Sequence, residues 1–209
     1  MPLYRDHVYS GLVSLLGNPK PIQEVRERIL PLAHGNVLEI GFGPGVNLAY
    51  YDPTAVRTLY ALEPSDSMIH IAERHPRRSA FAITFLEFPG ERIPLKDGAI
   101  DTVVSTFTLC TVSNVADVMA GIARVTRPGG KLIFLENTAS PDVTVLQWQR
   151  RWRPLACHMF AGLDLTRDIP SVIKAAGCVF ERIESGYLAR FPKSWSHCCW
   201  GSAVFPITN

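Results

Sequence analysis

The chain has 209 residues, 47% of them apolar, so we expect one domain over residues 1–209 with a substantial core. Its 21 basic and 19 acidic residues leave a formal net charge of +2, which gives no reason to expect a nucleic acid or an acidic membrane as partner. The five cysteines form no C-x-x-C motif, which favours reduced thiols in a cytoplasmic protein without a metal site. No run approaches about 18 apolar residues and no signal peptide is visible, so we expect no integral membrane association.

The first 34 residues predict a helical cap. Apolar side chains recur near helical spacing on both sides of a break at Gly17-Asn18-Pro19. Two interpretations stay open. The segment is either a cap packed on the domain or a lid over a substrate pocket, to which it would contribute Tyr4, His7 or Tyr9.

From residue 36 onward, short apolar runs alternate with segments of helical periodicity. The runs predict strands at residues 37–40, 58–62, 82–86, 100–105 and 131–135, and a closing pair at 178–183 and 201–205. Helices are expected from Pro64 and from Ser113-Asn114, which can cap the second of them. Arg127-Pro-Gly-Gly130 predicts the turn that ends that helix. Strands that alternate with helices form a parallel sheet covered on both faces.

Residues 142–176 interrupt this alternation and predict a helical insert over the substrate pocket. Val145–Phe160 has the periodicity of an amphipathic helix, which Pro154 would kink or divide. Thr166 or Asp168 could cap the helix that follows.

The insert carries aromatic and basic side chains whose roles stay open. Trp148 and Trp152, one helical turn apart, either pack the insert or stack on a substrate. Arg150, Arg151 and Arg153 either form a solvated face or bind an acidic substrate.

The stretch at residues 36–48 is the most informative in the chain. A buried strand that contains Glu39 ends directly before three glycines at alternate positions, Gly41, Gly43 and Gly45. Glycines allow a strand to turn tightly into a helix, so backbone N–H groups and a helix N-terminus lie beside a ligand. Ligands of parallel sheets bind at the carboxyl ends of the strands, so we expect other polar residues at strand ends to gather there. These residues are Glu63, Glu91, Ser105, Thr106, Glu136 and Asn137.

The spacing from Glu39 through the three glycines, E-x-G-x-G-x-G, resembles the signature of Rossmann-like S-adenosylmethionine (SAM) methyltransferases. The dinucleotide fingerprint G-x-G-x-x-G is not met, because Val46 stands in place of its third glycine. Further points of resemblance are Glu63, the stretches 88–94 and 97–103, Arg127-Pro-Gly-Gly130 and the closing strand pair. The resemblance implies SAM as the cofactor and an α/β fold. The expected fold is a Rossmann-like, seven-stranded, mostly parallel sheet with a reversed C-terminal strand and helices on both faces.

The same resemblance implies how the site would hold SAM. Glu39 would accept a hydrogen bond from the ammonium group, and the N–H groups of the glycine turn suit the carboxylate. Glu63 would clamp the two ribose hydroxyls. The adenine would meet Glu91 or the backbone near Gly90, because Pro89 replaces an acidic residue that the family commonly has. The other residues expected at the cofactor are Gly41, Gly43, Gly45, Asn47, Pro64 and Thr106.

Looser motifs in the C-terminal half bear on the methyl acceptor. They look similar to the methyltransferase-like 7 group, which are thiol S-methyltransferases, over Phe107–Val112, Leu135-Glu136, Trp148-Gln149, Trp152, Pro154, Phe160 and residues 165–168. That group carries an N-terminal membrane anchor, which is not seen in this sequence. Quinone C-methyltransferases and phospholipid N-methyltransferases share much of the pattern, so O-, N- or C-methylation of a phenol, quinone or lipid headgroup is the alternative.

Candidate general bases are few. A thiol acceptor needs only a weak base or none, because its pKa is about 8.5, whereas an alcohol needs a firm base. The candidates are His158 and Asp164 in the insert and His7 in the N-terminal segment, while His197 could line the pocket or belong to the last strand. Because no base stands out, a SAM-binding protein without catalysis is a second hypothesis. We expect a monomer or homodimer that acts on a small molecule.

Overall fold

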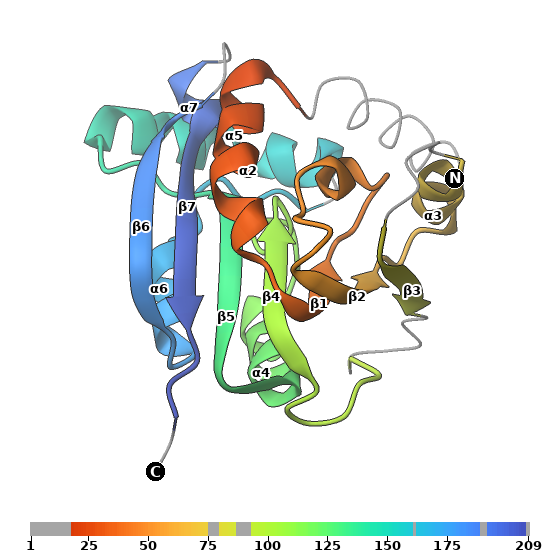
Figure 1. The fold of residues 1–209 in the computed structure, drawn as a ribbon. Helices are drawn as coiled ribbons and strands as arrows, with labels where there is room; N and C mark the ends of the chain where they lie inside the picture. The colour runs from red at the N-terminus through yellow and green to blue at the C-terminus, as the bar shows by residue number, and fades with distance from the viewer. Residues whose placement is uncertain (1–17, 75–79, 87–92, 161, 189–191, 208–209) are drawn as a thin grey trace.

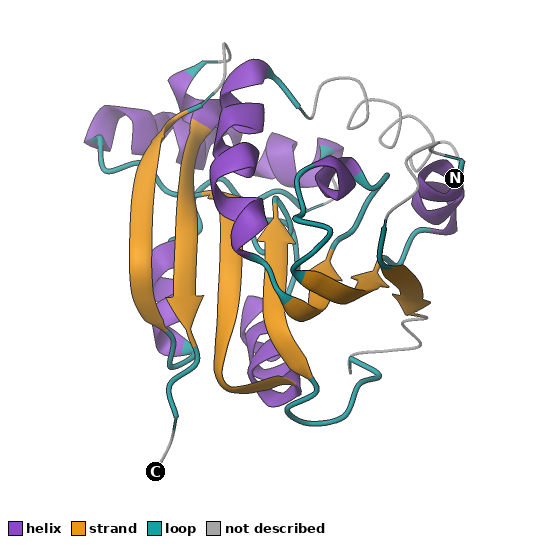
Figure 2. Ribbon diagram, viewed as in Figure 1, coloured by secondary structure: helices purple, strands orange, loops and turns teal. Residues whose placement is uncertain are grey.

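The computed structural model describes residues 18–74, 80–86, 93–160, 162–188 and 192–207. In this part of the chain a seven-stranded sheet runs in the order β3-β2-β1-β4-β5-β7-β6 (Figures 1 and 2). The strands are β1 Gly35–Ile40, β2 Val56–Leu62, β3 Ala82–Leu86, β4 Ile100–Thr106, β5 Thr126–Asn137, β6 Val179–Tyr187 and β7 His197–Val204. The helices are α2 Lys20–Ile29, α3 Asp66–Glu73, α4 Val115–Val125, α5 Val143–Met159, α6 Ile169–Ala175 and α7 Lys193–Ser196, with short 3-10 helices η1 Leu30–Leu32 and η2 Val46–Ala49.

The strand directions confirm the predicted α/β fold. Strands β1 to β5 pair in parallel, and β7 runs antiparallel to both of its neighbours, β5 and β6. The reversed strand is therefore the last one. The carboxyl ends of β1 and β4 meet at one edge, where Ile40 is paired with Ser105.

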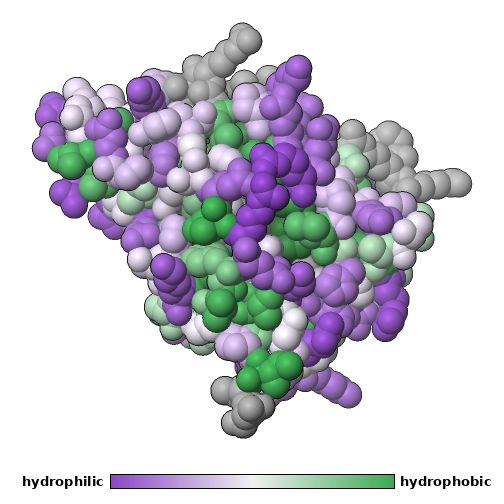
Figure 3. All heavy atoms as spheres, turned by 60° about the vertical axis from the view of Figure 1, so that its left-hand side comes forward, coloured by the Kyte–Doolittle hydropathy of each residue, from purple (hydrophilic) through white to green (hydrophobic). Residues whose placement is uncertain are grey.

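The central strands β1, β4 and β5 are largely buried on both faces. Successive side chains of a strand point to opposite faces, so each of these strands contributes to two cores. In β5, Leu132 and Phe134 join the core that includes α4 and α6, while Ile133 and Leu135 join the core that includes α2 and α3. Figure 1 shows α2 in front of the sheet and α4 and α6 behind it. The outer side of α2 is hydrophilic (Figure 3), so this amphipathic helix is held by its inner side.

Strand β5 is longer than predicted, because it includes Arg127-Pro-Gly-Gly130. Ile100 pairs with Thr126 and Thr102 pairs with Lys131, so the extra residues between these pairs bulge out of the ladder. Gly129 has φ +75°, and its N–H donates to the Phe205 carbonyl at 2.8 Å. The glycines thus make their turn at the start of the strand rather than before it. The closing strands also extend further than predicted, β6 to Tyr187 and β7 from His197.

In the insert, Val143–Met159 forms one continuous helix, α5, where the sequence predicts a kink or a division at Pro154. The proline is exposed, so water can take the place of the helical hydrogen bond that it lacks. Asp142 caps α5 by accepting from the N–H groups of Thr144 and Val145. Of the two predicted caps for α6, Asp168 is the one used.

The N-terminal segment is described only from Asn18. Tyr4, His7 and Tyr9, the predicted lid residues, lie outside the described residues. Helix α2 packs on the sheet through Ile22, Val25 and Ile29. Among the helices within these bounds, none is long and apolar enough to cross a membrane.

Candidate active site

The glycine turn follows β1 as the sequence predicts. Gly41, Gly43 and Gly45 have φ of 65°, 57° and 77°, a left-handed conformation that side chains disfavour. A Cβ at Gly41 would overlap Thr108 Oγ1, so the turn and the segment after β4 touch directly. Among the described residues, a Cβ at Gly43 would meet nothing closer than the Gly41 carbonyl oxygen at 4.0 Å. The backbone at Gly43 is therefore open to a ligand.

Glu39 is buried beneath this turn and held on two sides. Its Oε2 accepts from the Tyr51 hydroxyl at 2.6 Å, and its Oε1 accepts from Asn47 Nδ2 at 2.8 Å. Burial raises the pKa of Glu39 to about 7, although these two hydrogen bonds act in the opposite direction. The turn therefore covers a carboxylate that gains from a nearby positive charge.

Asn47 connects β1 to β4. Its Nδ2 also donates to Thr106 Oγ1 at 2.9 Å. Its Oδ1 is buried and has no hydrogen-bond partner within the described residues. Buried polar atoms are normally paired, so this oxygen is suited to accept from a bound donor group. Asn47 and Thr106, both predicted cofactor residues, thus lie together.

Glu63 follows β2 and reaches the glycine turn. Its Oε2 accepts from the Gly43 N–H at 2.8 Å, and its Oε1 accepts from the Ser65 N–H at 3.0 Å. Burial raises the pKa of Glu63, and these backbone hydrogen bonds partly oppose the shift. Pro64, the next predicted residue, is exposed. The turn, Glu39 and Glu63 are therefore assembled at one edge of the sheet.

Ser105 and Thr106, adjacent in β4, have different partners. Thr106 contacts Asn47 at the turn, whereas Ser105 Oγ donates to Glu136 Oε1 at 2.6 Å. Glu136 is buried at the end of β5 and accepts three further hydrogen bonds, each at 3.1 Å, from the backbone N–H groups of Thr108, Leu109 and Cys110. Burial raises the pKa of Glu136, and these hydrogen bonds partly oppose the shift. Glu136 thus anchors the loop after β4.

That loop begins with a strained residue. Phe107 has φ 55°, the left-handed region, which costs a non-glycine residue on the order of 1–3 kcal/mol. Its ring centroid lies 5.9 Å from the guanidinium carbon of Arg26 on α2. Arg26 is buried, and Glu39 is among the groups that interact with its charge. Sequence reasoning missed Arg26 and Tyr51, which no motif spacing marks.

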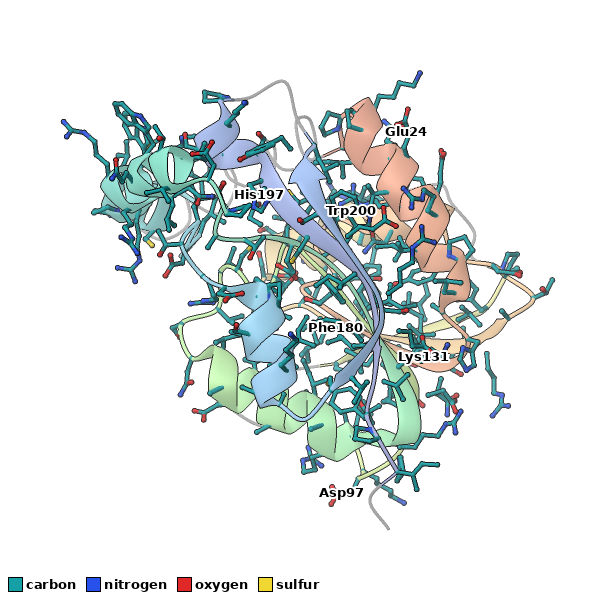
Figure 4. All side chains as sticks on the ribbon, turned by 90° about the vertical axis from the view of Figure 1, so that its left-hand side faces the viewer. Glu24, Asp97, Lys131, Phe180, His197 and Trp200 are labelled. Carbon is teal, nitrogen blue, oxygen red and sulfur yellow. The ribbon has the colours of Figure 1, made fainter. Side chains whose placement is uncertain are left out.

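Two of the predicted bases, His158 and Asp164, lie in the insert and not in the glycine turn, and His7 lies outside the described residues. Asp164 accepts from Arg153 Nε at 2.9 Å and from the Thr166 hydroxyl at 2.7 Å. Burial alone would raise the pKa of Asp164, but these hydrogen bonds outweigh it and the net shift is downward. His158 is exposed in the last turn of α5. His197 is buried at the start of β7 (Figure 4), with Nδ1 3.3 Å from the Thr138 carbonyl oxygen.

Gly90 and Glu91, the predicted adenine contacts, lie outside the described residues.

The five cysteines are free thiols, and Cys110, Cys178, Cys198 and Cys199 are buried. Within the described ranges, no group of three or more histidine, cysteine or acidic side chains is placed to hold a metal ion.

Comparison with known proteins decides the family. A model of the methyltransferase domain matches residues 38–134. Thiol S-methyltransferase TMT1A from Homo sapiens is 30% identical over 198 residues, which cover 92% of this chain and 76% of that protein. The chain belongs to the SAM-dependent methyltransferase family.

Two further proteins resemble this chain, one in sequence and one in fold. Thiol S-methyltransferase TMT1B from Homo sapiens is 34% identical over 134 residues. That match covers 63% of this chain and 55% of TMT1B, so the chain spans about half of that relative. A SAM dependent methyltransferase from Aquifex aeolicus has a crystal structure with a TM-score of 0.63 and 18% identity, covering 94% of this chain and 98% of that one. At this identity the likeness concerns the fold.

The residues present fit the methyl donor of this methyltransferase family. The amino-acid end of SAM is a zwitterion, which needs acceptors for its ammonium group and N–H donors for its carboxylate. Glu39 and the unsatisfied Oδ1 of Asn47 offer acceptors, and the open backbone at Gly43 offers room for close approach.

Proposed function

We propose that this protein methylates the sulfur of a small-molecule thiol, with SAM as the methyl donor. When bound, SAM would supply a methyl group on a positively charged sulfonium sulfur. The acceptor thiol would lose its proton to solvent, and its sulfur would bond to the methyl carbon as the carbon–sulfonium bond breaks and S-adenosylhomocysteine leaves. The chain contributes binding, orientation and the exclusion of water, which can supply most of the rate of such a displacement.

For the donor, each polar group of the site takes a separate part. Glu39 and Asn47 Oδ1 accept hydrogen bonds from the ammonium group. Glu63 accepts from the ribose hydroxyls, for which its two backbone hydrogen bonds already orient it. Gly41, Gly43 and Gly45 keep the backbone close to the carboxylate. Gly90 and Glu91 keep their proposed place at the adenine.

For the acceptor, one observation carries the proposal: the described ionisable groups near the ends of β4 and β5 already form hydrogen bonds within the protein. Glu136 accepts four hydrogen bonds, Asp164 is bonded to Arg153 and Thr166, and His197 contacts a carbonyl oxygen. None of these groups is placed to act as a free base. A thiol has a pKa of about 8.5 and supplies some thiolate near neutral pH by itself. The names of the two human relatives, thiol S-methyltransferases, support the same acceptor.

Acceptors that differ only in sulfur and oxygen test the proposal. Purified protein is incubated with methyl-labelled SAM and with thiophenol, phenol, an alkyl thiol, its alcohol, a quinol and an amine. We expect labelled methyl thioethers from the thiols and no product from their oxygen counterparts. When thiols of different acidity are compared, the pH at which the rate rises should shift with the pKa of the thiol. Product from only the phenol, quinol or amine would overturn the thiol assignment.

Because the candidate bases are already hydrogen-bonded within the protein, one other function is favoured: a SAM-binding protein that transfers no methyl group. Isothermal titration with SAM and with its demethylated product, S-adenosylhomocysteine, separates the two. Binding of both ligands without product from any acceptor would support the binding protein. Binding of neither would contradict both candidates.

A further inference from the structure

Helix α5 presents a row of large apolar side chains to solvent. Trp148, Trp152, Leu155 and Met159 are 49%, 38%, 43% and 55% exposed. Because they recur every three or four residues, they share one face of the helix, which we call the α5 stripe. The residues that fix the helix to the domain point elsewhere and are buried: Val145, Gln149 and Ala156. These buried residues anchor α5 to the domain and leave much of the stripe open to solvent.

Positive charge borders the α5 stripe. Helix α5 carries three arginines and no acidic residue between its first and last positions. The Arg151 guanidinium carbon lies 5.8 Å from the Trp148 ring centroid. Helix α7 packs beside the stripe, with Trp195 6.4 Å from Trp152 between ring centroids, and contributes the exposed Lys193. Among the described residues, no acidic side chain forms an ion pair with Arg151 or Lys193. The net charge of +2 conceals this local excess.

We propose that the α5 stripe docks this protein on the surface of a membrane that contains anionic lipids. Amphipathic helices with tryptophan and leucine on one face and arginine or lysine beside it lie in the interfacial layer of a bilayer. Tryptophan favours that layer, and basic side chains near it are attracted by anionic headgroups. In Figure 4 the teal helix α5 lies at the upper left, where it projects from the body of the domain and many of its side chains extend into solvent.

The position of α5 in the chain gives the docking an orientation. The helix follows β5 after a short loop, at the carboxyl edge of the sheet that carries the glycine turn. Gln149 fixes α5 to that loop, since its side chain accepts from the Ser140 N–H and donates to the Thr138 carbonyl oxygen. These two hydrogen bonds link α5 to the loop at the cofactor edge, so docking on the stripe would place this edge near the lipid.

Vesicle sedimentation with the full chain tests the proposal. Vesicles of phosphatidylcholine, with and without phosphatidylserine, are mixed with wild-type protein at low and high salt. We expect binding that requires phosphatidylserine and weakens with salt. Trp148→Ser with Leu155→Ser should reduce binding at least about tenfold, because both side chains insert at the interface. Arg151→Glu should reduce binding about tenfold or more, because one attractive charge becomes repulsive.

Two variants of the same helix serve as matched controls. Val143→Ser removes an apolar side chain that is 69% exposed but lies off the stripe. Arg150→Glu makes the same charge change as Arg151→Glu at an exposed position on another face of α5. Both should bind vesicles like wild type. Melting temperature and S-adenosylhomocysteine binding confirm that every variant is folded.

Several results would overturn the docking. These are no binding to either vesicle, equal binding to both, or equal losses in the stripe and control variants. A wild-type dimer in sedimentation that the stripe variant dissolves, without vesicle binding, would assign the stripe to a second copy instead. None of these results depends on the acceptor, so the docking and the proposed function can fail separately.

Discussion

The Tyr51 hydroxyl donates to Glu39 Oε2 at 2.6 Å, which ties the segment after η2 to β1 inside the core. Tyr51→Phe removes the donor and leaves a buried carboxylate oxygen without it. A hydrogen bond to a charged group contributes about 1.5–3 kcal/mol, so we expect a loss of that size in the free energy of unfolding. Urea denaturation measures it, at a pH well above the pKa of Glu39.

The adjacent tyrosine provides the control for Tyr51. The Tyr50 hydroxyl accepts from Asn18 Nδ2 at 2.9 Å, so Tyr50→Phe removes a bond between neutral groups. We expect it to cost about 0.5–1.5 kcal/mol. Equal losses in the two variants would mean that the charge of Glu39 adds nothing to the bond with Tyr51.

The second prediction concerns pH. Burial raises the pKa of Glu39 from 4.5 to about 7, so the folded protein keeps this proton where the unfolded chain has lost it. Stability should therefore fall as the pH rises from 4.5 to about 7 and level off above. The fall attributable to Glu39 is about 3 kcal/mol. Glu39→Gln should remove this part of the slope, while Glu63 and Glu136, whose pKa values burial also raises, keep the rest.

Ligand binding should show the opposite pH dependence. The ammonium group of S-adenosylhomocysteine gains from Glu39 only when the carboxylate is ionised. Wild-type affinity should therefore rise up to a pH of about 7, and the affinity of Glu39→Gln should rise less over this range, because among the described carboxylates of the site only Glu63 still titrates. Titration calorimetry across the range measures both. Identical profiles for the two proteins would remove Glu39 from the ammonium site.

The third prediction tests Glu63 as the ribose ligand. Glu63→Ala should weaken S-adenosylhomocysteine binding roughly tenfold to a hundredfold, since a hydrogen bond to a charged group is lost. Asp66→Ala, an exposed carboxylate at the start of α3, should leave affinity unchanged. Glu63 also holds the Gly43 N–H, so a ligand analogue without ribose hydroxyls is needed. If Glu63→Ala weakens binding of that analogue as much as it weakens binding of S-adenosylhomocysteine, Glu63 acts through the glycine turn and not on the ribose.

The fold was more predictable than the connections inside its site. The run at Ala82–Leu86 matches β3, and the alternate glycines predict the turn, because each signal is local and depends on backbone geometry. Bonds such as Tyr51 to Glu39, or Glu136 to the loop after β4, join residues that only the folded sheet brings together. No periodicity specifies them. Arg26 was missed for the same reason, since a single arginine in a helix usually faces solvent.

The fourth prediction separates two effects at the glycine turn: the contact of an added Cβ with a neighbouring side chain, and the conformational cost of a positive φ. Gly41→Ala forces a Cβ onto Thr108 Oγ1, which is held by the carbonyl oxygens of Ile40 and Thr106 at 3.0 and 3.2 Å. Gly177 has φ +84°, and no atom of the described part of the chain lies within 4 Å of a Cβ at this position. Gly177→Ala should therefore meet only the conformational cost of about 1–2 kcal/mol. We expect overpacking to lower the free energy of unfolding of Gly41→Ala by about 1–3 kcal/mol more.

Thermal and urea unfolding compare the two glycine variants. Adding Thr108→Ala to Gly41→Ala should recover part of the loss, because the overlapping hydroxyl is gone. Equal losses in Gly41→Ala and Gly177→Ala, with no recovery in the double variant, would show that contact with Thr108 does not limit the turn.

The fifth prediction concerns Asp164, for which two roles predict different results. As a base, Asp164→Asn should lower kcat by about a hundredfold to ten-thousandfold and remove a limb of the pH profile. A positioning role is favoured by three hydrogen bonds. The Asp164 side chain accepts from Arg153 and Thr166, and its backbone N–H donates to the Cys110 carbonyl oxygen at 2.8 Å. We therefore expect Asp164→Asn to lower the melting temperature and raise KM for the acceptor, while the pH profile of kcat keeps its shape. His158→Gln, at an exposed site on α5, is the matched test of the other candidate base and should leave both KM for the acceptor and the pH profile of kcat unchanged. A lost limb in either variant would identify that residue as the base and weaken the case for a thiol that ionises unaided.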